Sequence, residues 1–349
     1  MKPLCAITMG DPAGIGPEIA LKAILSKDLP QCSIFIIGDA EVLEQAKRFL
    51  SIFPELNAIS RVGEIKAGRV NVLDLKQVSI KDFSVGKVQA NCGRASYNYV
   101  IRGIELALKG DIDAIVTNPI SKEALKMAGI NYPGHTEILA DKTGTKNFSM
   151  MFASENVHVV HVTTHVSLKQ ALTMITKEAV LTHTRLLDIA LRNLGIRSPQ
   201  IAISGLNPHA GENGLFGDEE ILHIAPAVAQ AKKEGIDASG PFPPDTVFMR
   251  AFKGEFDGVV SMLHDHGFVA LKTRNFEGGV NITLGLPIIR TSVGHGTAFD
   301  IAGKGIASEK SLIAAIEAAV KMAKNKEMGN LRDSPQGRVS RRTLENEPK

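Results

Sequence analysis

The feature that most constrains the fold is a repeated alternation of short apolar runs with longer helical patterns. The apolar runs are nearly continuous, as is typical of strands covered on both faces. Such alternation predicts α/β layers on a largely parallel sheet. The predicted strands span 3–9, 33–39, 69–75, 112–117, 148–154, 157–164, 199–205, 257–263, 280–286 and 287–293, and the predicted helices span 17–26, 95–110, 177–195, 219–235 and 311–326.

Chain length and strand number predict two domains. A chain of 349 residues fits two domains, and ten strands are many for one sheet. We therefore expect two α/β/α domains with a cleft between them. The first comprises 1–130 plus about 285–326, and the second comprises 131–284. Residues 327–349 have few apolar side chains and mixed charge, which predicts a loosely ordered tail.

Composition excludes several function classes. The 40 basic and 37 acidic residues give a net charge of +3, which provides no reason to expect a nucleic acid or a membrane as partner. The chain has no tryptophan and three tyrosines, too few for extensive base stacking. Its three cysteines are scattered singly, which fits the reducing cytoplasm.

Three histidines follow three different predicted strands. They are His165 after 157–164, His209 after 199–205, and His264 after 257–263. Strand ends of this kind can meet at the carboxyl edge of a sheet, and neutral imidazoles are common ligands of zinc and similar ions. Three protein ligands with one open position are the arrangement of a catalytic metal site. Spacing alone, however, favours the alternative that each histidine is a cap or a hydrogen-bonded core residue.

The other histidines divide into two groups. We interpret four as residues of the sheet or of helices, namely His158, His161, His183 and His223. His266 lies next to the candidate site, where Asp265 could orient a metal-binding histidine.

Two further patterns suggest anion binding. The stretch MGDPAGIGPE (9–18) joins a predicted strand to a predicted helix, so that it fits either an anion site at the helix N-terminus or a tight structural turn. Lys272, Asn281 and Arg290 lie near predicted strand ends. Lysine and arginine together suit a phosphate or a carboxylate, and an unpaired guanidinium in an apolar run such as the one around Arg290 would be costly.

These stretches together resemble one family. MGDPAGIGPE, NYPGHTE (131–137), TTH (163–165), NPHAGENGLFGDEE (207–220), PPDTVF (243–248), LHDHG (263–267) and IRTSVGHGTAFDIAGKG (289–305) occur in the order found in the 4-hydroxythreonine-4-phosphate dehydrogenase family, which includes the D-threonate and D-erythronate 4-phosphate dehydrogenases. The first and last stretches are also similar to segments of isocitrate and isopropylmalate dehydrogenases.

The resemblance implies a fold, cofactors and partners. The fold is the two-domain α/β fold of isocitrate and isopropylmalate dehydrogenases. The cofactors are NAD or NADP and a divalent metal, zinc first, with magnesium or cobalt as alternatives. The partner is a second copy of the chain, in a homodimer whose site combines metal ligands from both subunits.

The resemblance also assigns residues. His165, His209 and His264 would bind the metal. The substrate would contact His135, Thr136, Lys272, Asn281 and Arg290. The cofactor would contact Gly294, His295, Gly296, Thr297 and Asp300. The general base stays open among Lys272, Asp245 and His135.

The implied activity is that of an oxidoreductase in pyridoxine biosynthesis. It oxidises the secondary alcohol of a 4-phosphorylated hydroxy acid of the 4-phosphooxy-L-threonine type, with decarboxylation of the β-keto acid. D-threonate or D-erythronate 4-phosphate is the alternative substrate, and dihydrodiol carboxylates a more distant one. Three histidines with a Lys/Arg pair would also suit a metal-dependent phosphatase or hydrolase, and a non-catalytic sugar- or metal-binding protein is a further class. Two positions depart from the family pattern, His266 in place of glutamine and Gly294 in place of aspartate.

Overall fold

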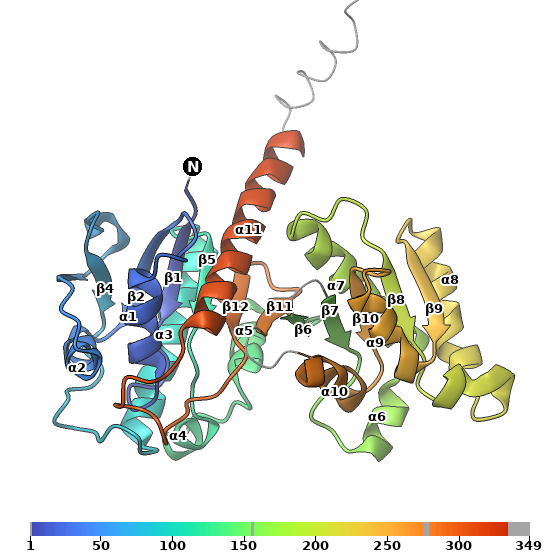
Figure 1. Ribbon diagram of the computed structural model, residues 1–349, viewed down its shortest axis with the longest axis horizontal. Helices are drawn as coiled ribbons and strands as arrows, with labels where there is room; N and C mark the ends of the chain where they lie inside the picture. The colour runs from blue at the N-terminus through green and yellow to red at the C-terminus, as the bar shows by residue number, and fades with distance from the viewer. Residues whose placement is uncertain (1, 155–156, 275–278, 334–349) are drawn as a thin grey trace, which may run out of the picture.

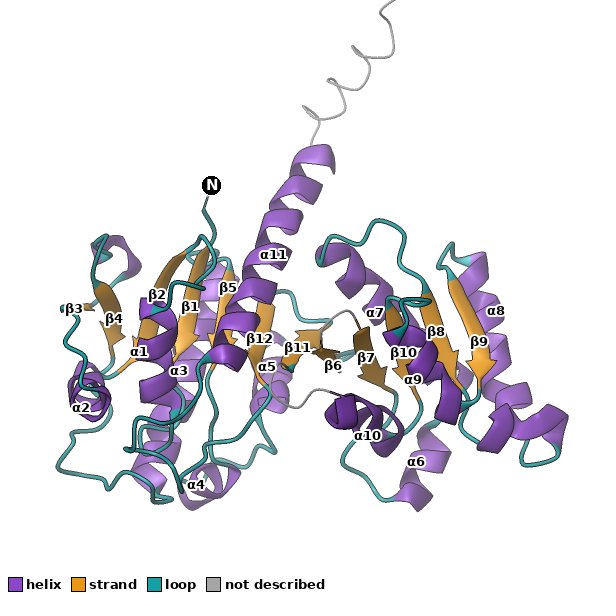
Figure 2. Ribbon diagram, viewed as in Figure 1, coloured by secondary structure: helices purple, strands orange, loops and turns teal. Residues whose placement is uncertain are grey.

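The computed structural model describes residues 2–154, 157–274 and 279–333. In this part of the chain, twelve strands form one sheet in the order β3-β4-β2-β1-β5-β12-β11-β6-β7-β10-β8-β9. The sheet crosses the whole molecule, and helices cover both of its faces (Figure 1 and Figure 2). The strands are β1 Leu4–Thr8, β2 Ser33–Gly38, β3 Leu56–Ile59, β4 Val70–Asp74, β5 Ala114–Thr117, β6 Ser149–Ser154, β7 Val157–His161, β8 Ile201–Ser204, β9 Ala238–Phe242, β10 Gly258–Ser261, β11 Val280–Leu284 and β12 Ile289–Val293.

The helices fill the connections between the strands. The α-helices are α1 Gly16–Leu25, α2 Ala40–Leu50, α3 Ala90–Lys109, α4 Lys122–Met127, α5 His135–Thr143, α6 Leu168–Met174, α7 Lys177–Asn193, α8 Ala225–Lys233, α9 Pro244–Phe252, α10 His264–Arg274 and α11 Lys310–Asp333. Shorter helical segments are η1 Val62–Glu64, η2 Pro208–Gly214 and η3 Glu220–Ile224. Three helices begin with a side-chain N-cap. The hydroxyl oxygens of Ser121, Ser167 and Thr176 accept backbone N–H groups in the first turns of α4, α6 and α7.

All ten predicted strands are confirmed, but they do not form two separate sheets. The parallel order is interrupted in the middle, where β11 pairs antiparallel with both β12 and β6, and β6 pairs antiparallel with β7. This antiparallel pair joins the two parallel halves into one sheet. The argument that ten strands are too many for one sheet was therefore wrong, although the α/β class and the helix-covered sheet were correct.

The division into two domains remains our proposal, and the strand pairing bears on its boundary near residue 285. β12 pairs in parallel with β5 of the first half, whereas β11 pairs with β6 of the second half. A boundary near residue 285 thus falls between β11 and β12. The prediction of a loosely ordered tail from residue 327 was wrong for residues 327–333, because they belong to α11, which continues to Asp333. Residues 334–349 lie outside the described residues.

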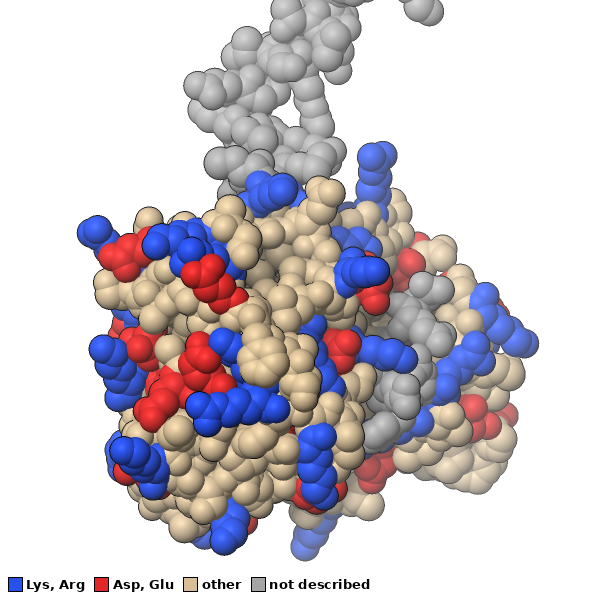
Figure 3. Space-filling model, turned by 60° about the vertical axis from the view of Figure 1, so that its left-hand side comes forward, with Lys and Arg blue, Asp and Glu red and all other residues tan. Residues whose placement is uncertain are grey.

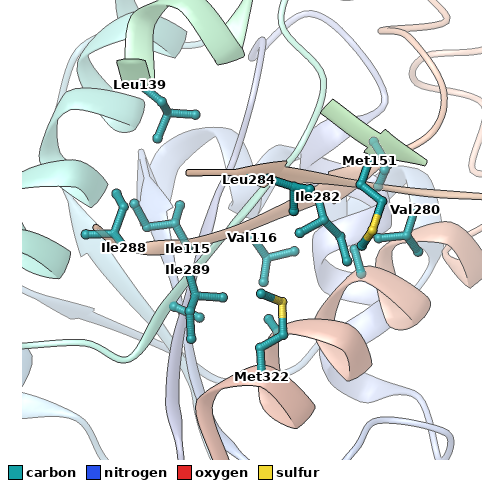
Figure 4. Packing of buried hydrophobic residues seen from close by; sticks show 14 of the residues in the cluster. Ile115, Val116, Leu139, Met151, Val280, Ile282, Leu284, Ile288, Ile289 and Met322 are labelled. Atoms are coloured by element: carbon teal, nitrogen blue, oxygen red, sulfur yellow. The ribbon is translucent and has the colours of Figure 1, made fainter. Parts of the chain in front are cut away.

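The hydrophobic core is continuous across the join between the two halves. One face of the sheet carries Val116 of β5, Ile289 of β12, Ile282 of β11 and Met151 of β6, and Met322 of α11 packs against this face (Figure 4). α11 stands upright between the two halves in Figure 1. Burial of these apolar side chains holds the two halves together.

The stretch MGDPAGIGPE forms the connection between β1 and α1, as expected. It contains Asp11, which is fully buried and whose carboxylate accepts the backbone N–H of Ala13 (2.9 Å). Its second carboxylate oxygen has no hydrogen-bond partner among the described residues. Burial raises the pKa of Asp11 from about 3.8 to about 6.

Asp11 is therefore expected to destabilise the folded protein at neutral pH. The folded chain holds a proton that the unfolded chain releases between about pH 4 and pH 6, so the free energy of unfolding falls by about 3 kcal/mol over this window. Asp11→Asn removes this loss, and its stability relative to the unmodified protein should rise by about that amount from pH 4 to pH 7.5. Urea unfolding at both pH values measures the difference. Asp28→Asn, a change at an exposed position, is the control, and a flat profile for Asp11→Asn would contradict the account.

The surface carries no dominant charge on the face shown in Figure 3, where basic and acidic side chains are interspersed. Among the described residues, every helix is too short or too polar to cross a bilayer.

Candidate active site

A cavity of about 270 Å³ lies at the carboxyl edge of the sheet, beside the central strands. The strand order places β5, β12 and β11 next to one another there, and the N-terminus of α5 faces the same space. Residues that are far apart in the sequence therefore meet at one site. Among them are His135, Thr136, His165, Asn281, Arg290 and His295.

Arg290 is the most deeply buried charge of this cavity. It is 3% exposed on β12, and its guanidinium donates to the hydroxyl oxygens of Thr117 (2.7 and 3.2 Å) and Thr283 (2.9 Å). Within the described residues, no carboxylate forms an ion pair with it. Burial lowers the pKa of Arg290 to about 9, so it stays charged at neutral pH. A buried cation that is bonded only to hydroxyls is a site for an anion.

The N-terminus of α5 forms the wall opposite this charge. α5 begins at His135, directly after Gly134, so the N–H groups of its first turn have no partners inside the helix. The Nε2 atom of His135 is buried without a hydrogen-bond partner, and burial together with the charge of Arg290 holds the pKa of His135 well below its usual value. His135 is thus a neutral imidazole with a nitrogen free for a ligand.

Two more buried polar atoms of this cavity lack partners among the described residues. They are Oδ1 of Asn281, whose amide nitrogen donates to the carbonyl of Val293 (3.3 Å), and Nε2 of His295. Buried polar atoms in proteins are normally paired. Their convergence on one cavity therefore indicates a polar ligand, and the cavity contains four of the five predicted substrate contacts.

His165 and His264 form a pair next to this cavity. Their ring centroids are 5.7 Å apart, and both line a second cavity of about 270 Å³. The Nδ1 atom of His264 is 2.7 Å from a carboxylate oxygen of Asp265, the orienting contact expected from the sequence. His165 also lines the anion cavity. A metal cation held by the two imidazoles would therefore lie beside a ligand bound to Arg290.

His209 does not join this pair within one chain. No group of three or more histidine, cysteine, aspartate or glutamate residues in the described ranges could hold a metal ion. His209 is exposed on a left-handed segment, residues 209–213. Glu220 holds the start of this loop, because its carboxylate accepts the N–H groups of Leu206 (2.7 Å) and Asn207 (2.8 Å). The predicted trio is therefore present as two residues together and one apart.

Lys272 does not lie near a strand end, contrary to expectation. The apolar run after His264 is helix α10, on which His264, Phe268 and Lys272 are spaced four residues apart and share one face. Lys272 is exposed, with its Nζ 5.4 Å from the ring centroid of Phe268, and it does not line the anion cavity.

Asp245 also lies away from the anion cavity. It lines a separate groove of about 1240 Å³ between α9 and α10, together with His266. Of the three candidates for the general base, His135 is therefore the one that lines the anion cavity within a single chain.

The segment predicted to bind the cofactor follows β12 and packs on the first motif. The carbonyl of Thr297 accepts the N–H of Ile15 (3.0 Å), and a Cβ on Gly14 would lie only 3.0 Å from that carbonyl oxygen. The buried Glu18 accepts the N–H groups of Gly303 and Gly305. In this structure the stretch MGDPAGIGPE is thus a tight turn that supports the second segment.

Only some of the five predicted cofactor contacts lie at the anion cavity. His295 and Gly296 line the anion cavity, whereas Asp300 is exposed. Gly294 donates its N–H to the hydroxyl of Ser311 (3.1 Å), and a Cβ there would lie 2.6 Å from the carbonyl oxygen of Gly279. A side chain at position 294 would therefore require this neighbour to move.

Two residues of the anion cavity were missed from the sequence. Lys122 and Glu137 line the anion cavity. His161, which was interpreted as a sheet residue, is buried at the end of β7 with its ring stacked on Phe268 (4.6 Å between centroids). Burial lowers the pKa of His161 to about 3. A sequence signal existed for Lys122, because it follows the predicted strand 112–117 as His165 follows another.

Comparison with known proteins decides the family. The family model described as "Pyridoxal phosphate biosynthetic protein PdxA" matches residues 30–319. The chain belongs to the PdxA family. Among curated members, a protein of Oceanobacillus iheyensis named "Putative D-threonate 4-phosphate dehydrogenase" is 48% identical over 330 residues, which cover 93% of this chain and 99% of that protein.

Solved structures of similar proteins share the fold. The 4-hydroxythreonine-4-phosphate dehydrogenase of Klebsiella pneumoniae has a TM-score of 0.84 at 44% identity, with 93% of this chain and 98% of that chain covered. A terephthalate 1,2-cis-dihydrodiol dehydrogenase of Burkholderia xenovorans LB400 has a TM-score of 0.67 at 29% identity, with 92% and 98% covered. The α/β fold expected from the resemblance is therefore confirmed.

Proposed function

We propose that this PdxA-family chain is a metal- and NAD(P)-dependent dehydrogenase that oxidises the secondary alcohol of a 4-phosphorylated hydroxy acid of the 4-hydroxythreonine-4-phosphate type. The observation that carries the proposal is the placement of the buried Arg290 and the His165–His264 pair on two cavities that share His165. One cavity suits an anionic end of the substrate, and the other suits a cation. A substrate that spans both would hold its alcohol next to the cation.

The residues of the anion cavity would bind and orient the substrate. Arg290 and the first turn of α5 would hold the phosphate, since helix N-termini and guanidinium groups both favour phosphate oxygens. The neutral ring of His135 would supply one hydrogen bond, and Asn281 would supply another through its unpaired oxygen. These contacts fix the position of the alcohol relative to the imidazole pair.

The donor set next to this cavity fits a divalent ion only in part. His165 and His264 supply two imidazoles, and zinc sites of catalytic type commonly have three protein ligands. We propose that His209 of a second copy completes the set, which would make the enzyme a homodimer with shared sites. A bound divalent ion, zinc first, with magnesium or cobalt as alternatives, would lower the pKa of the substrate hydroxyl and stabilise negative charge on its oxygen.

NAD or NADP would accept the hydride, and we propose that the segment Gly294–Gly305 contacts it. The support is its position, because His295 and Gly296 lie on the wall of the anion cavity, and Glu18 and Lys22 hold the far end of the segment in place. The β-keto acid formed by oxidation would then lose CO₂. A cytoplasmic location fits the three free thiols of the described chain.

D-threonate 4-phosphate is the second candidate substrate, because the curated relatives carry that name at 44–48% identity. It differs from 4-phosphooxy-L-threonine at C2, where a hydroxyl replaces the amino group. Both molecules share the phosphate, the carboxylate and the alcohol on which the site acts. The described cavity thus suits the class of substrate in either case.

A panel assay tests the proposal. The purified protein, supplied with zinc, magnesium or cobalt, is mixed with 4-phosphooxy-L-threonine, D-threonate 4-phosphate or D-erythronate 4-phosphate and either NAD or NADP. We expect the nicotinamide absorbance at 340 nm to rise with at least one phosphorylated substrate and far less with its unphosphorylated analogue. Release of inorganic phosphate without a rise in absorbance would instead favour the hydrolase class.

A further inference from the structure

Lys122 is a charged residue of the anion cavity to which the sequence assigned no role. It is the first residue of α4 and follows β5 at the carboxyl edge of the sheet. A Cβ built on Gly134 would lie 4.0 Å from Cε of Lys122, so the end of the lysine side chain reaches the residue that precedes α5. Lys122 and the N-terminus of α5 therefore face the same space.

The charges on the cavity wall show why Lys122 matters. The lysine, arginine, aspartate and glutamate residues on the wall are Lys122, Glu137 and Arg290. Glu137 is close enough to Arg290 to raise its pKa, so these two charges oppose each other in the field that a ligand meets. Lys122 makes no ion pair within the described ranges. Without Lys122 the charges of Arg290 and Glu137 would cancel, so Lys122 gives the cavity wall its net positive charge.

We propose that Lys122 is a further substrate-binding residue, which holds the phosphate between its ammonium group and the N-terminus of α5. This inference rests on the proposed function for the identity of the substrate. It places the second cation of the anion site on α4 of the same chain, whereas Lys272, which was expected in that role, lies on α10 outside this cavity. A lysine suits phosphate as a mobile point charge, while the fixed fork of Arg290 sets the orientation.

Binding of inorganic phosphate tests the proposal without any need for catalysis. Lys122→Met keeps the apolar stem and removes the charge. Its Kd for inorganic phosphate, measured by calorimetry at low ionic strength, should be about tenfold higher than that of the unmodified protein. Lys126→Met is the matched control, because Lys126 is an exposed residue of the same helix and does not line the cavity, and its Kd should be unchanged. An unchanged Kd in Lys122→Met, or no phosphate binding by the unmodified protein, would overturn the proposal.

Kinetics then separate a phosphate contact from a structural role. In Lys122→Met the KM for the phosphorylated substrate should rise about tenfold with kcat nearly unchanged, and Lys122→Arg should recover most of the loss. KM for the unphosphorylated analogue should not move. An equal rise in KM for both substrates would overturn the assignment to phosphate. If the unmodified protein oxidises none of the panel, the proposed function fails, and the calorimetry still decides the role of Lys122.

Discussion

Complete removal of divalent metal by a chelator is expected to lower the rate of NAD(P)H formation about a thousandfold or more. The cation would stabilise negative charge on the substrate oxygen by several kcal/mol, and each 1.36 kcal/mol of barrier corresponds to a factor of ten. Absorbance at 340 nm measures the rate before and after chelation, and addition of zinc, magnesium or cobalt should restore it. Full turnover after verified metal removal would contradict the role of the imidazole pair.

The same expectation can be tested at the two residues. His165→Ala and His264→Ala should each cause a loss of rate and a loss of bound metal, measured by elemental analysis of the dialysed protein. His223→Ala is the matched control, because His223 lies in the helical segment η3 and lines neither cavity of the site. It should retain both metal and activity. Retention of metal by both His165→Ala and His264→Ala would place the ion elsewhere.

Arg290→Ala is expected to lower kcat/KM for the phosphorylated substrate by about a hundred- to a thousandfold. Loss of one partner of a buried charged contact typically costs about 2–5 kcal/mol, and Arg290 is buried with hydroxyls as its only hydrogen-bond partners among the described residues. The loss should be much smaller with the unphosphorylated analogue. An equal loss with both substrates would show that Arg290 does not bind the phosphate.

Arg290 also forms hydrogen bonds within the sheet, so the stability of each Arg290 variant must be measured together with its kinetics. Removal of its side chain leaves the hydroxyls of Thr117 and Thr283 without these donors and opens a cavity, so a lower melting temperature is expected. Arg290→Lys keeps a charge and most of the volume but loses the fork that reaches both threonines. It should melt closer to the unmodified protein while still binding the phosphorylated substrate more weakly. A normal KM in a folded Arg290→Lys would count against a bidentate contact.

The fold was predictable from the sequence where the patterns are long. Every predicted strand exists, and long helices such as α3, α7 and α11 were found because their apolar periodicity extends over several turns. α10 was missed because its sequence, HDHGFVALKTR, consists of one short apolar block between two polar blocks and has no clear helical stripe. β3 and the short helices α4 and α5 were missed because elements of so few residues are too short to show a hydrophobic periodicity.

The anion site was predictable in part because strand ends converge. Arg290 and Asn281 meet on neighbouring strands, and α5 brings His135 to them. The order of the strands in the sheet cannot be read from one sequence. This order explains where the three histidines and Lys122 lie. β7 and β10 are neighbours, so His165 and His264 come together, whereas β8 lies one strand further out and the left-handed loop after it exposes His209. Lys122 was missed for the same reason, since only the pairing of β5 with β12 brings it to Arg290.

The most direct test of the central claim is the position of the metal in a crystal of the protein soaked with zinc, located by anomalous scattering. The account predicts one strong peak per chain within about 2.1 Å of a nitrogen of both His165 and His264, with His209 of a neighbouring subunit as the third ligand. A peak outside coordination range of these rings, with every neighbouring subunit included, would contradict it.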